Sequence, residues 1–385
     1  MPEKKLKIGF ISSAPLEDKR NWSGSMFSIY QSLLKKGYDI VHIKTPVFSS
    51  FERKLFIFIE KVYQNLFNRG FNTHHFITKS VLASRKIKKQ IERENIDILF
   101  APTTISEIAF LNIGQPIVYL NDANVNQLLN YYSYYSGFGW LSKKITHYIE
   151  KRALHQSHTI IYSSEWAAKD AENFYKIPKS KINVVKFGAN SEVPDKINLN
   201  KDYTHEIVFL FLAVLWERKG GDLALKTIEL LRKKGYRVKL QVVGCNPNVK
   251  SDSMEVIPFL NKNIPEEAQK IKDFLNNAHF LFIPTKADCT PISFCEAAGY
   301  GLPVITSNTG GIADLVEDGI TGFTLPENAT PEDYALRIEQ LLNNHTLIQT
   351  MSANARKKYE RELNWEIWAE KTDEILSRIF PNPKI

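Results

Sequence analysis

Short apolar runs alternate with amphipathic segments in the first half of the chain. The runs are rich in Ile, Val, Phe and Tyr and end in polar or turn-forming residues, as buried strands do. Segments with apolar residues at helical spacing lie between them. The strands predicted here are 6–12, one within 36–45, 97–102, 117–122, 158–164 and 183–190. Strands that alternate with helices predict a parallel sheet with helices on both faces.

The same pattern restarts after a polar segment, 191–205, that contains a proline. We therefore expect an α/β protein of two doubly wound domains. Ligands of such sheets bind at the carboxyl ends of the strands, so we expect the two domains to face each other across a cleft that holds the site. The strands of the second half are 207–214, 238–244, 279–285 and 303–308. The predicted domains are 1–190, a linker at 191–205, 206–362, and a C-terminal helix, 363–385, that crosses back to the first domain.

Charge separates the two halves further. Residues 1–190 carry 27 Lys and Arg against 15 Asp and Glu, a net charge of +12, whereas the remaining 195 residues carry 23 against 27, a net charge of −4. A basic half favours an anionic partner, such as a phospholipid surface or a phosphorylated substrate, and solubility alone is the alternative. Nucleic acid would also fit the charge, but no recognition motif is present, so we do not expect it as a partner.

Several features favour a cytoplasmic protein. The apolar start, IGFI, is far shorter than the apolar region of a signal peptide, and no segment is long and apolar enough to span a bilayer. The three cysteines, Cys245, Cys289 and Cys295, lack CxxC spacing, which indicates structural residues in a reducing compartment.

The stretch DCTPISFCE (288–296) holds two carboxylates eight positions apart. Asp288 follows a buried strand, and a helix is expected to begin near Pro291, which is tolerated in a first turn. The free N–H groups of Ile292 and Ser293 would then hold a phosphate. Asp288 and Glu296 would flank it and bind hydroxyl groups on both sides of a diphosphate. The alternative is a capping Asp and a stray surface Glu.

A second candidate is WERKGGD (216–222), which follows another strand and opens a helix. Arg218 and Lys219 would stand at the carboxyl edge of the sheet, where two cations can neutralise a leaving diphosphate. The alternative is an exposed basic loop.

Two weaker candidates lie in the first half. Gly24 and Ser25, in SGS (23–25), precede a helix, and glycine permits close approach of a ligand. Asp122 ends the strand 117–122, where it is either near a reacting sugar or caps a helix. Two aromatic segments also allow two interpretations each. The run 131–140 either contacts an acceptor or membrane or packs on its own domain, and the basic, aromatic segment 51–71 is either an interfacial helix or a core-facing one.

Taken together, the strand, acid, turn, small-residue helix, GLPV (301–304) and Thr-Gly-Gly from 309 resemble the retaining GT-B glycosyltransferases of family four. The resemblance covers nearly the whole chain and is strongest over 206–325. It implies two Rossmann-like domains and a nucleotide-diphosphate sugar as co-substrate. It also implies that Asp288 contacts the donor sugar, that Glu296 binds the ribose, and that Gly244, Thr309 and Gly310 lie in the donor site.

The chain departs from the family pattern at three positions. The first acid is Asp288 rather than the usual Glu, Val214 stands where an Arg is usual, and Pro291 replaces a frequent Gly. Adjacent Arg218 is expected to replace the missing Arg. These differences bear on donor preference and geometry rather than on the class.

The resemblance further implies hexosyl or related transfer, by front-face attack of the acceptor while the leaving phosphate helps to remove its proton. No cofactor or metal is expected, and no metal-ligand motif is present. The expected acceptor is a glycan, a lipid-linked saccharide or another molecule used in cell-surface polysaccharide or glycoconjugate synthesis. Peripheral contact of the basic domain with the inner membrane face is also considered. The alternatives are a catalytically silent GT-B subunit that binds a protein or glycan, and an epimerase or phosphorylase on the same fold.

Overall fold

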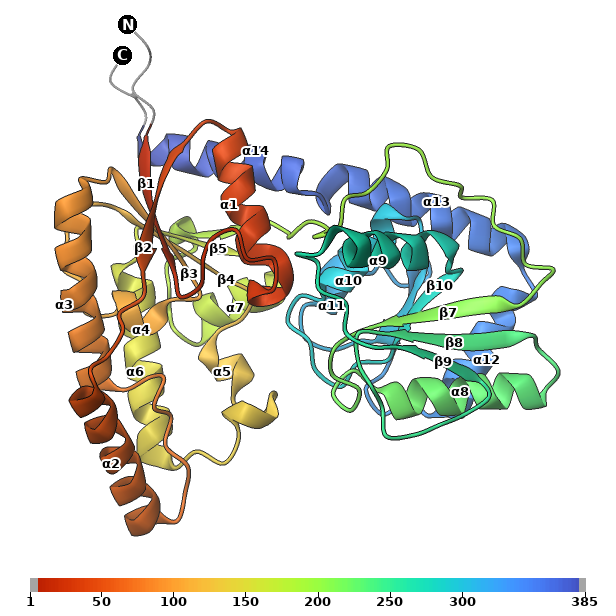
Figure 1. The fold of residues 1–385 in the computed structure, drawn as a ribbon, viewed down its shortest axis with the longest axis horizontal. Helices are drawn as coiled ribbons and strands as arrows, with labels where there is room; N and C mark the ends of the chain where they lie inside the picture. Colours follow the sequence, from red (N-terminus) through yellow and green to blue (C-terminus); the bar gives the residue numbers. More distant parts are fainter. Residues whose placement is uncertain (1–5, 381–385) are drawn as a thin grey trace, which may run out of the picture. The chain divides into compact units, whose positions relative to one another are not determined.

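The computed structural model describes residues 6–380, which form two units, each built on its own β-sheet (Figure 1). Unit 1 contains the described residues up to Asp18, Ile29–Val185 and those from Ala369 onward. Unit 2 contains Lys19–Ser28 and Lys186–Trp368. The segment predicted as a linker, 191–205, lies in unit 2, where Val193, Ile197 and Tyr203 pack against the core.

Unit 1 has a six-stranded parallel sheet with the strand order β2-β1-β3-β4-β5-β6. Strands β3, β4 and β5 are fully buried, which explains their nearly continuous apolar sequences. The strands are β1 (Lys7–Ser12), β2 (Asp39–Lys44), β3 (Ile98–Pro102), β4 (Ile117–Asn121), β5 (Thr159–Tyr162) and β6 (Ile182–Val184). The helices are α1 (Ser25–Lys35), α2 (Ser50–Phe67), α3 (Ile77–Glu94), α4 (Ile105–Ile108), α5 (Val125–Leu128), α6 (Trp140–Gln156) and α7 (Glu165–Asn173).

Unit 2 also has a six-stranded parallel sheet, in the order β12-β11-β10-β7-β8-β9. In Figure 1, α8 and α9 lie on opposite sides of its strands. The strands are β7 (Ile207–Leu212), β8 (Val238–Val243), β9 (Met254–Ile257), β10 (Phe280–Ile283), β11 (Val304–Ser307) and β12 (Gly322–Leu325). The helices are α8 (Gly221–Lys233), α9 (Pro265–Asn277), α10 (Ile292–Gly299), α11 (Ile312–Leu315), α12 (Pro331–Leu342), α13 (His345–Glu362) and α14 (Trp365–Ile379), of which α14 belongs to unit 1 from Ala369.

The predicted α/β class with two parallel sheets is confirmed. Strands β9 and β12 were not predicted from the sequence. Both lie at the edges of the unit 2 sheet, and a polar residue, Glu255 or Thr324, interrupts each short run, which weakens the apolar signal. The strand predicted over 183–190 is shorter than expected, because β6 ends at Val184 and the chain enters unit 2 at Lys186. No helix within residues 6–380 is long and apolar enough to cross a membrane.

A buried carboxylic acid fixes the loop that follows β4 in unit 1. Glu150, on α6, accepts hydrogen bonds from the Val125 N–H at 2.7 and 3.0 Å, and it also contacts the Tyr175 hydroxyl. Burial raises the pKa of Glu150 to about 8. The first turn of α5 is therefore tied to α6, which holds the segment between β4 and α5 in place.

Candidate functional site

The candidate site in unit 2 lies where the strand order of the sheet reverses. The chain runs from β7 outward to β8 and β9 on one side, and from β10 outward to β11 and β12 on the other. Strands β7 and β10 are neighbours, paired between Phe209 and Phe280 and between Leu210 and Leu281. The loops after these two strands therefore flank the topological switch point, which is where open α/β sheets bind ligands.

The loop after β7 is fastened to the loop after β10 by backbone contacts. The Arg218 carbonyl accepts a hydrogen bond from the Lys286 N–H at 2.8 Å. Gly220 has φ +76°, a left-handed conformation that favours glycine, and an added Cβ there would lie 1.9 Å from the Pro284 carbonyl oxygen. Glycine at this position thus lets the two loops approach closely and brings the adjacent Lys219 to the loop after β10.

Lys219 forms a buried ion pair with Asp288, the first acid of the motif. Arg218 supports the same carboxylate. Its guanidinium donates to the Ala287 carbonyl at 2.5 Å and lies 3.9 Å from Asp288 Oδ2. The structure thus brings the three predicted catalytic residues of unit 2 together, two cations with one anion. The alternative of an exposed basic loop is wrong for Lys219, which is only 8% exposed.

Helix α10 begins at Ile292, directly after Pro291, as predicted. In this turn the Phe294 N–H donates a hydrogen bond to the Pro291 carbonyl at 3.0 Å. The N–H groups of Ile292 and Ser293 precede it, at the positive end of the helix dipole. Asp288 is not the N-cap of α10, because Pro291 occupies that position, so the capping alternative is wrong.

Glu296, the second acid, is buried on α10, and the alternative of a surface Glu is also wrong. Its Oε1 atom accepts hydrogen bonds from Ser191 Oγ at 2.7 Å and from Lys262 Nζ at 2.5 Å. None of residues 6–380 donates to Oε2. Glu296 therefore presents one fixed oxygen and one acceptor for a ligand hydroxyl.

Ser191 and Lys262, the two partners of Glu296, were not predicted from the sequence. Ser191 lies at the start of the segment predicted as a linker, and Lys262 lies in the turn before α9. Neither belongs to a recognisable motif, and both are far from Glu296 along the chain. Only the fold brings them to α10.

Gly24 and Ser25 belong to unit 2 rather than to the unit formed by most of the first half. The Asn190 side-chain amide donates to the Ser23 carbonyl at 2.9 Å and to Ser25 Oγ at 3.1 Å. Gly24 has φ +95°. The loop thus lies against Asn190, the residue before Ser191, which in turn contacts Glu296.

The other predicted donor-site residues follow neighbouring strands of the same sheet. Gly244 follows β8 with φ +105°, and an added Cβ would lie 2.8 Å from the Ala213 carbonyl oxygen. Thr309 and Gly310 follow β11, and Gly310 has φ +58°. Because β11, β10, β7 and β8 are adjacent and parallel, these loops share one edge of the sheet with the loops that hold Lys219 and Asp288.

Asp122 lies in unit 1, directly after β4, and its N–H donates to the Asn121 side chain at 3.0 Å. It is not the N-cap of α5, which is Asn124.

The aromatic run 131–140 packs partly on its own unit, for example through Tyr131 and Trp166, whose ring centroids are 5.7 Å apart. Among residues 6–380, no group of three or more His, Cys, Asp or Glu side chains is arranged to hold a metal ion.

Replacing Gly220 with Ala is expected to destabilise the protein by more than about 3 kcal/mol, because the new Cβ would meet the Pro284 carbonyl at 1.9 Å in an unfavourable backbone conformation. Chemical denaturation measures the loss. The matched control is Gly235→Ala. Gly235 has φ +92° but no atom within 4 Å of an added Cβ, so only the backbone term of about 1 kcal/mol is expected there. Equal losses in the two variants would contradict the close loop packing.

Two family models match consecutive parts of the chain. The model described as "Glycosyltransferase Family 4" matches residues 54–193, and the model described as "Glycosyl transferases group 1" matches residues 193–358. Together they cover parts of both units and include Lys219, Asp288 and Glu296.

Similar proteins come from bacteria and from the archaeon Methanocaldococcus jannaschii. The capsular polysaccharide biosynthesis glycosyltransferase CapM of Staphylococcus aureus is 27% identical over 59% of this chain and 63% of its own length. The amylovoran biosynthesis glycosyltransferase AmsK of Erwinia amylovora is 28% identical over 52% of each chain. The alignments thus span about half to two thirds of these relatives. A crystal structure of a glycosyltransferase from Rickettsia africae has a TM-score of 0.68 and 14% identity, and the match covers 98% of this chain and all of that one, which shows a common fold.

Proposed function

Because the chain belongs to glycosyltransferase family 4 and has the GT-B fold, we propose that it transfers a sugar from a nucleotide-diphosphate donor to an acceptor. The acceptor in this proposal is a glycan, a lipid-linked saccharide or another molecule used in cell-surface polysaccharide or glycoconjugate synthesis. The names of the relatives CapM and AmsK, which are polysaccharide biosynthesis glycosyltransferases, support that setting.

The observation that carries the proposal is the pairing of Lys219 with Asp288 at the switch point of unit 2, close in sequence to the start of α10. Group transfer from a diphosphate develops negative charge on the leaving group. Preorganised cations and helix N–H groups stabilise that charge without reorganisation. Arg218, Lys219 and the N–H groups of Ile292 and Ser293 supply such groups at one edge of the sheet.

The two acids receive separate roles in the proposal. Asp288, held by Lys219, orients hydroxyl groups of the donor sugar. Oε2 of Glu296 accepts a hydrogen bond from a ribose hydroxyl, while Ser191 and Lys262 hold Oε1 in place. Gly24, Ser25, Gly244, Thr309 and Gly310 allow close approach of the donor. Asp122 is proposed to act on the acceptor side.

The proposed reaction retains the anomeric configuration. The acceptor hydroxyl attacks the anomeric carbon on the face that the diphosphate leaves. The bond to the diphosphate breaks as the new glycosidic bond forms, and the hydroxyl proton passes to a departing phosphate oxygen. No protein nucleophile is required. The proposal includes no metal and no bound cofactor, since Arg218, Lys219 and the helix dipole balance the diphosphate charge. A cytoplasmic location is also proposed, and the three buried, unbridged cysteines agree with it.

A thermal-shift panel of nucleotide sugars tests donor binding. One donor is expected to raise the Tm of the wild-type protein, because a ligand that binds only the folded state stabilises it. Asp288→Ala is expected to lose discrimination among sugars and still to respond to the free nucleoside diphosphate. A wild-type protein that responds to no donor would contradict the proposal. Donor binding without any transfer would instead favour a catalytically silent GT-B subunit.

A further inference from the structure

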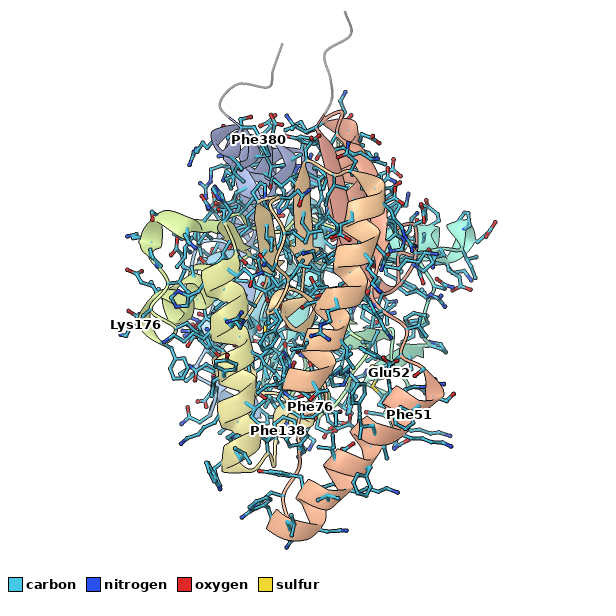
Figure 2. All side chains as sticks on the ribbon, turned by 90° about the vertical axis from the view of Figure 1, so that its left-hand side faces the viewer. Phe51, Glu52, Phe76, Phe138, Lys176 and Phe380 are labelled. Carbon is cyan, nitrogen blue, oxygen red and sulfur yellow. The ribbon has the colours of Figure 1, made fainter. Side chains whose placement is uncertain are left out.

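Helix α2 of unit 1 exposes an apolar stripe along its length. Phe51, Leu55, Phe58, Val62 and Leu66 are all exposed, and Leu66 is 72% exposed. Their spacing of four, three, four and four residues places them on one face of the helix. The stripe is about 22 Å long at the rise of an α-helix. Figure 2 shows α2, with Phe51 in its first turn, at the lower margin of unit 1. The alternative of a core-facing helix over 51–71 therefore fails for most of its apolar residues.

A second face of α2, which carries Phe56 and Tyr63, is fixed to unit 1, so the exposed stripe is not a consequence of a loose helix. Phe56 packs edge-on against Phe76, with ring centroids 6.1 Å apart, and Tyr63 packs against Phe71 at 4.9 Å. A capping box formed by Ser49 and Glu52 begins the helix. Two anchoring side chains are thus buried, and the stripe is presented outward.

The exposed charged residues that border the stripe of α2 on one side are basic. Lys54 and Lys61 are exposed, and each lies one turn from Phe58, along one side of the stripe. The two acids of the helix, Glu52 and Glu60, are only partly exposed. Glu52 is neutralised by Lys86 at 2.9 Å. The exposed side of the helix therefore combines apolar residues with positive charge.

A basic pocket adjoins the C-terminal end of α2. It has a volume of about 560 Å³, and Phe67 of α2 contributes to its wall. Arg69 and Lys143 supply two cations. The described residues that line the pocket include no Asp or Glu. Trp140, also in the wall, is 61% exposed, and Lys144 lies 5.1 Å from the centre of its ring. A partly exposed Trp beside cations is typical of groups that lie at a membrane interface.

We propose that the α2 stripe and this pocket form a docking surface for an anionic lipid bilayer, with a lipid phosphate in the pocket. The stripe would lie in the plane of the interface and bury Phe51, Phe58 and Leu66 among the acyl chains. Lys54 and Lys61 would meet anionic headgroups. Charge complementarity selects this occupant over a second copy of the chain, because pairing two α2 helices would bring like charges together.

The proposal extends the proposed function, because it brings unit 1 to the surface where lipid-linked acceptors lie. Docking itself requires no sugar transfer. Donor binding by unit 2 therefore serves as an independent readout, and failure of docking is distinguishable from failure of the transferase proposal.

The test is co-sedimentation of the full chain with vesicles of phosphatidylglycerol and phosphatidylcholine, and with vesicles of phosphatidylcholine alone. The wild-type protein is expected to bind the anionic vesicles and to be released by added salt. Leu66→Ser is expected to weaken binding about tenfold or more, because it removes an apolar side chain from the interface. The matched control is Leu336→Ser, on α12 of unit 2, where the leucine is likewise exposed and binding is expected to stay unchanged.

A second variant and a second measurement complete the test. Lys143→Gln is expected to reduce the preference for anionic over neutral vesicles. Inorganic phosphate that replaces chloride at constant ionic strength is expected to leave vesicle binding largely intact. Loss of vesicle binding with phosphate alone would assign the pocket to a free anion and overturn the lipid assignment. The lipid assignment would also be overturned if Leu66→Ser left vesicle binding unchanged, or if the wild-type protein did not bind anionic vesicles. A wild-type dimer that Leu66→Ser dissociates, seen by light scattering, would assign the stripe to self-association instead.

Discussion

Replacing Lys219 with Met is expected to lower the rate of sugar transfer by about 10²- to 10³-fold, the usual loss when one preorganised charge-stabilising group is removed. Lys219 stands at the switch point of unit 2, where its ammonium group pairs with Asp288 and faces the loop that precedes α10. A methionine fills similar space but carries no charge. The measurement is kcat with the donor that the thermal-shift panel identifies.

The same substitution leaves Asp288 buried without its closest cation, so a loss of stability is also expected, of order 3–5 kcal/mol for a broken buried pair. The double variant Lys219→Met/Asp288→Asn separates the two effects. It is expected to recover much of the stability but none of the turnover. Lys226→Met, an exposed position on α8, is the control and is expected to retain full activity. Turnover within a few-fold of wild type in Lys219→Met would remove this lysine from the proposed chemistry.

Replacing Glu296 with Gln is expected to weaken binding of the donor and of the free nucleoside diphosphate alike, by about 10- to 100-fold. The reason is that a hydrogen bond to a charged acceptor contributes about 1.5–3 kcal/mol. Glutamine keeps the size of the side chain and one acceptor, but it carries no charge and has an NH2 donor in place of the second oxygen. Isothermal titration with both ligands measures the change.

Lys262→Met is the matched control for this prediction. Lys262 contacts Oε1 of Glu296, the oxygen that is already fixed, and the proposed ligand contact is at Oε2. If Glu296 acts directly on the ligand, Lys262→Met should weaken binding much less than Glu296→Gln. Equal losses in the two variants would mean that Glu296 serves only to hold the turn before α9.

The sequence predicts the framework of both sheets because their central strands are continuously apolar and almost entirely buried, as in β3, β7 and β10. It fails at the two edges of the unit 2 sheet, where β9 and β12 each contain a polar residue and β9 is half-exposed. The exposed stripe of α2 illustrates a different limit. The sequence shows an apolar, basic helix over 51–71, but which of its faces is buried depends on Phe71 and Phe76, which no periodicity identifies as its partners.

The residues of the candidate site also differ in how far the sequence predicts them. Lys219, Asp288 and Glu296 are predictable because each lies after a strand or on a helix within a recognisable motif. Ser191 and Lys262 are not, because their contact with Glu296 arises from long-range packing alone. Membership of Gly24 and Ser25 in unit 2 is likewise a property of the fold, since Asn190 binds a loop more than 160 residues earlier in the chain.

The most direct test of transferase activity is release of nucleoside diphosphate from the identified donor. The reaction would contain the wild-type protein or Lys219→Met, with membrane-lipid and polysaccharide fractions as acceptor sources. The proposed function predicts acceptor-dependent release by the wild-type protein, slower by about 10²-fold or more in the variant. Tight donor binding by the wild-type protein, with release no faster than in Lys219→Met for every fraction, would contradict it and identify the chain as a donor-binding subunit without transfer activity.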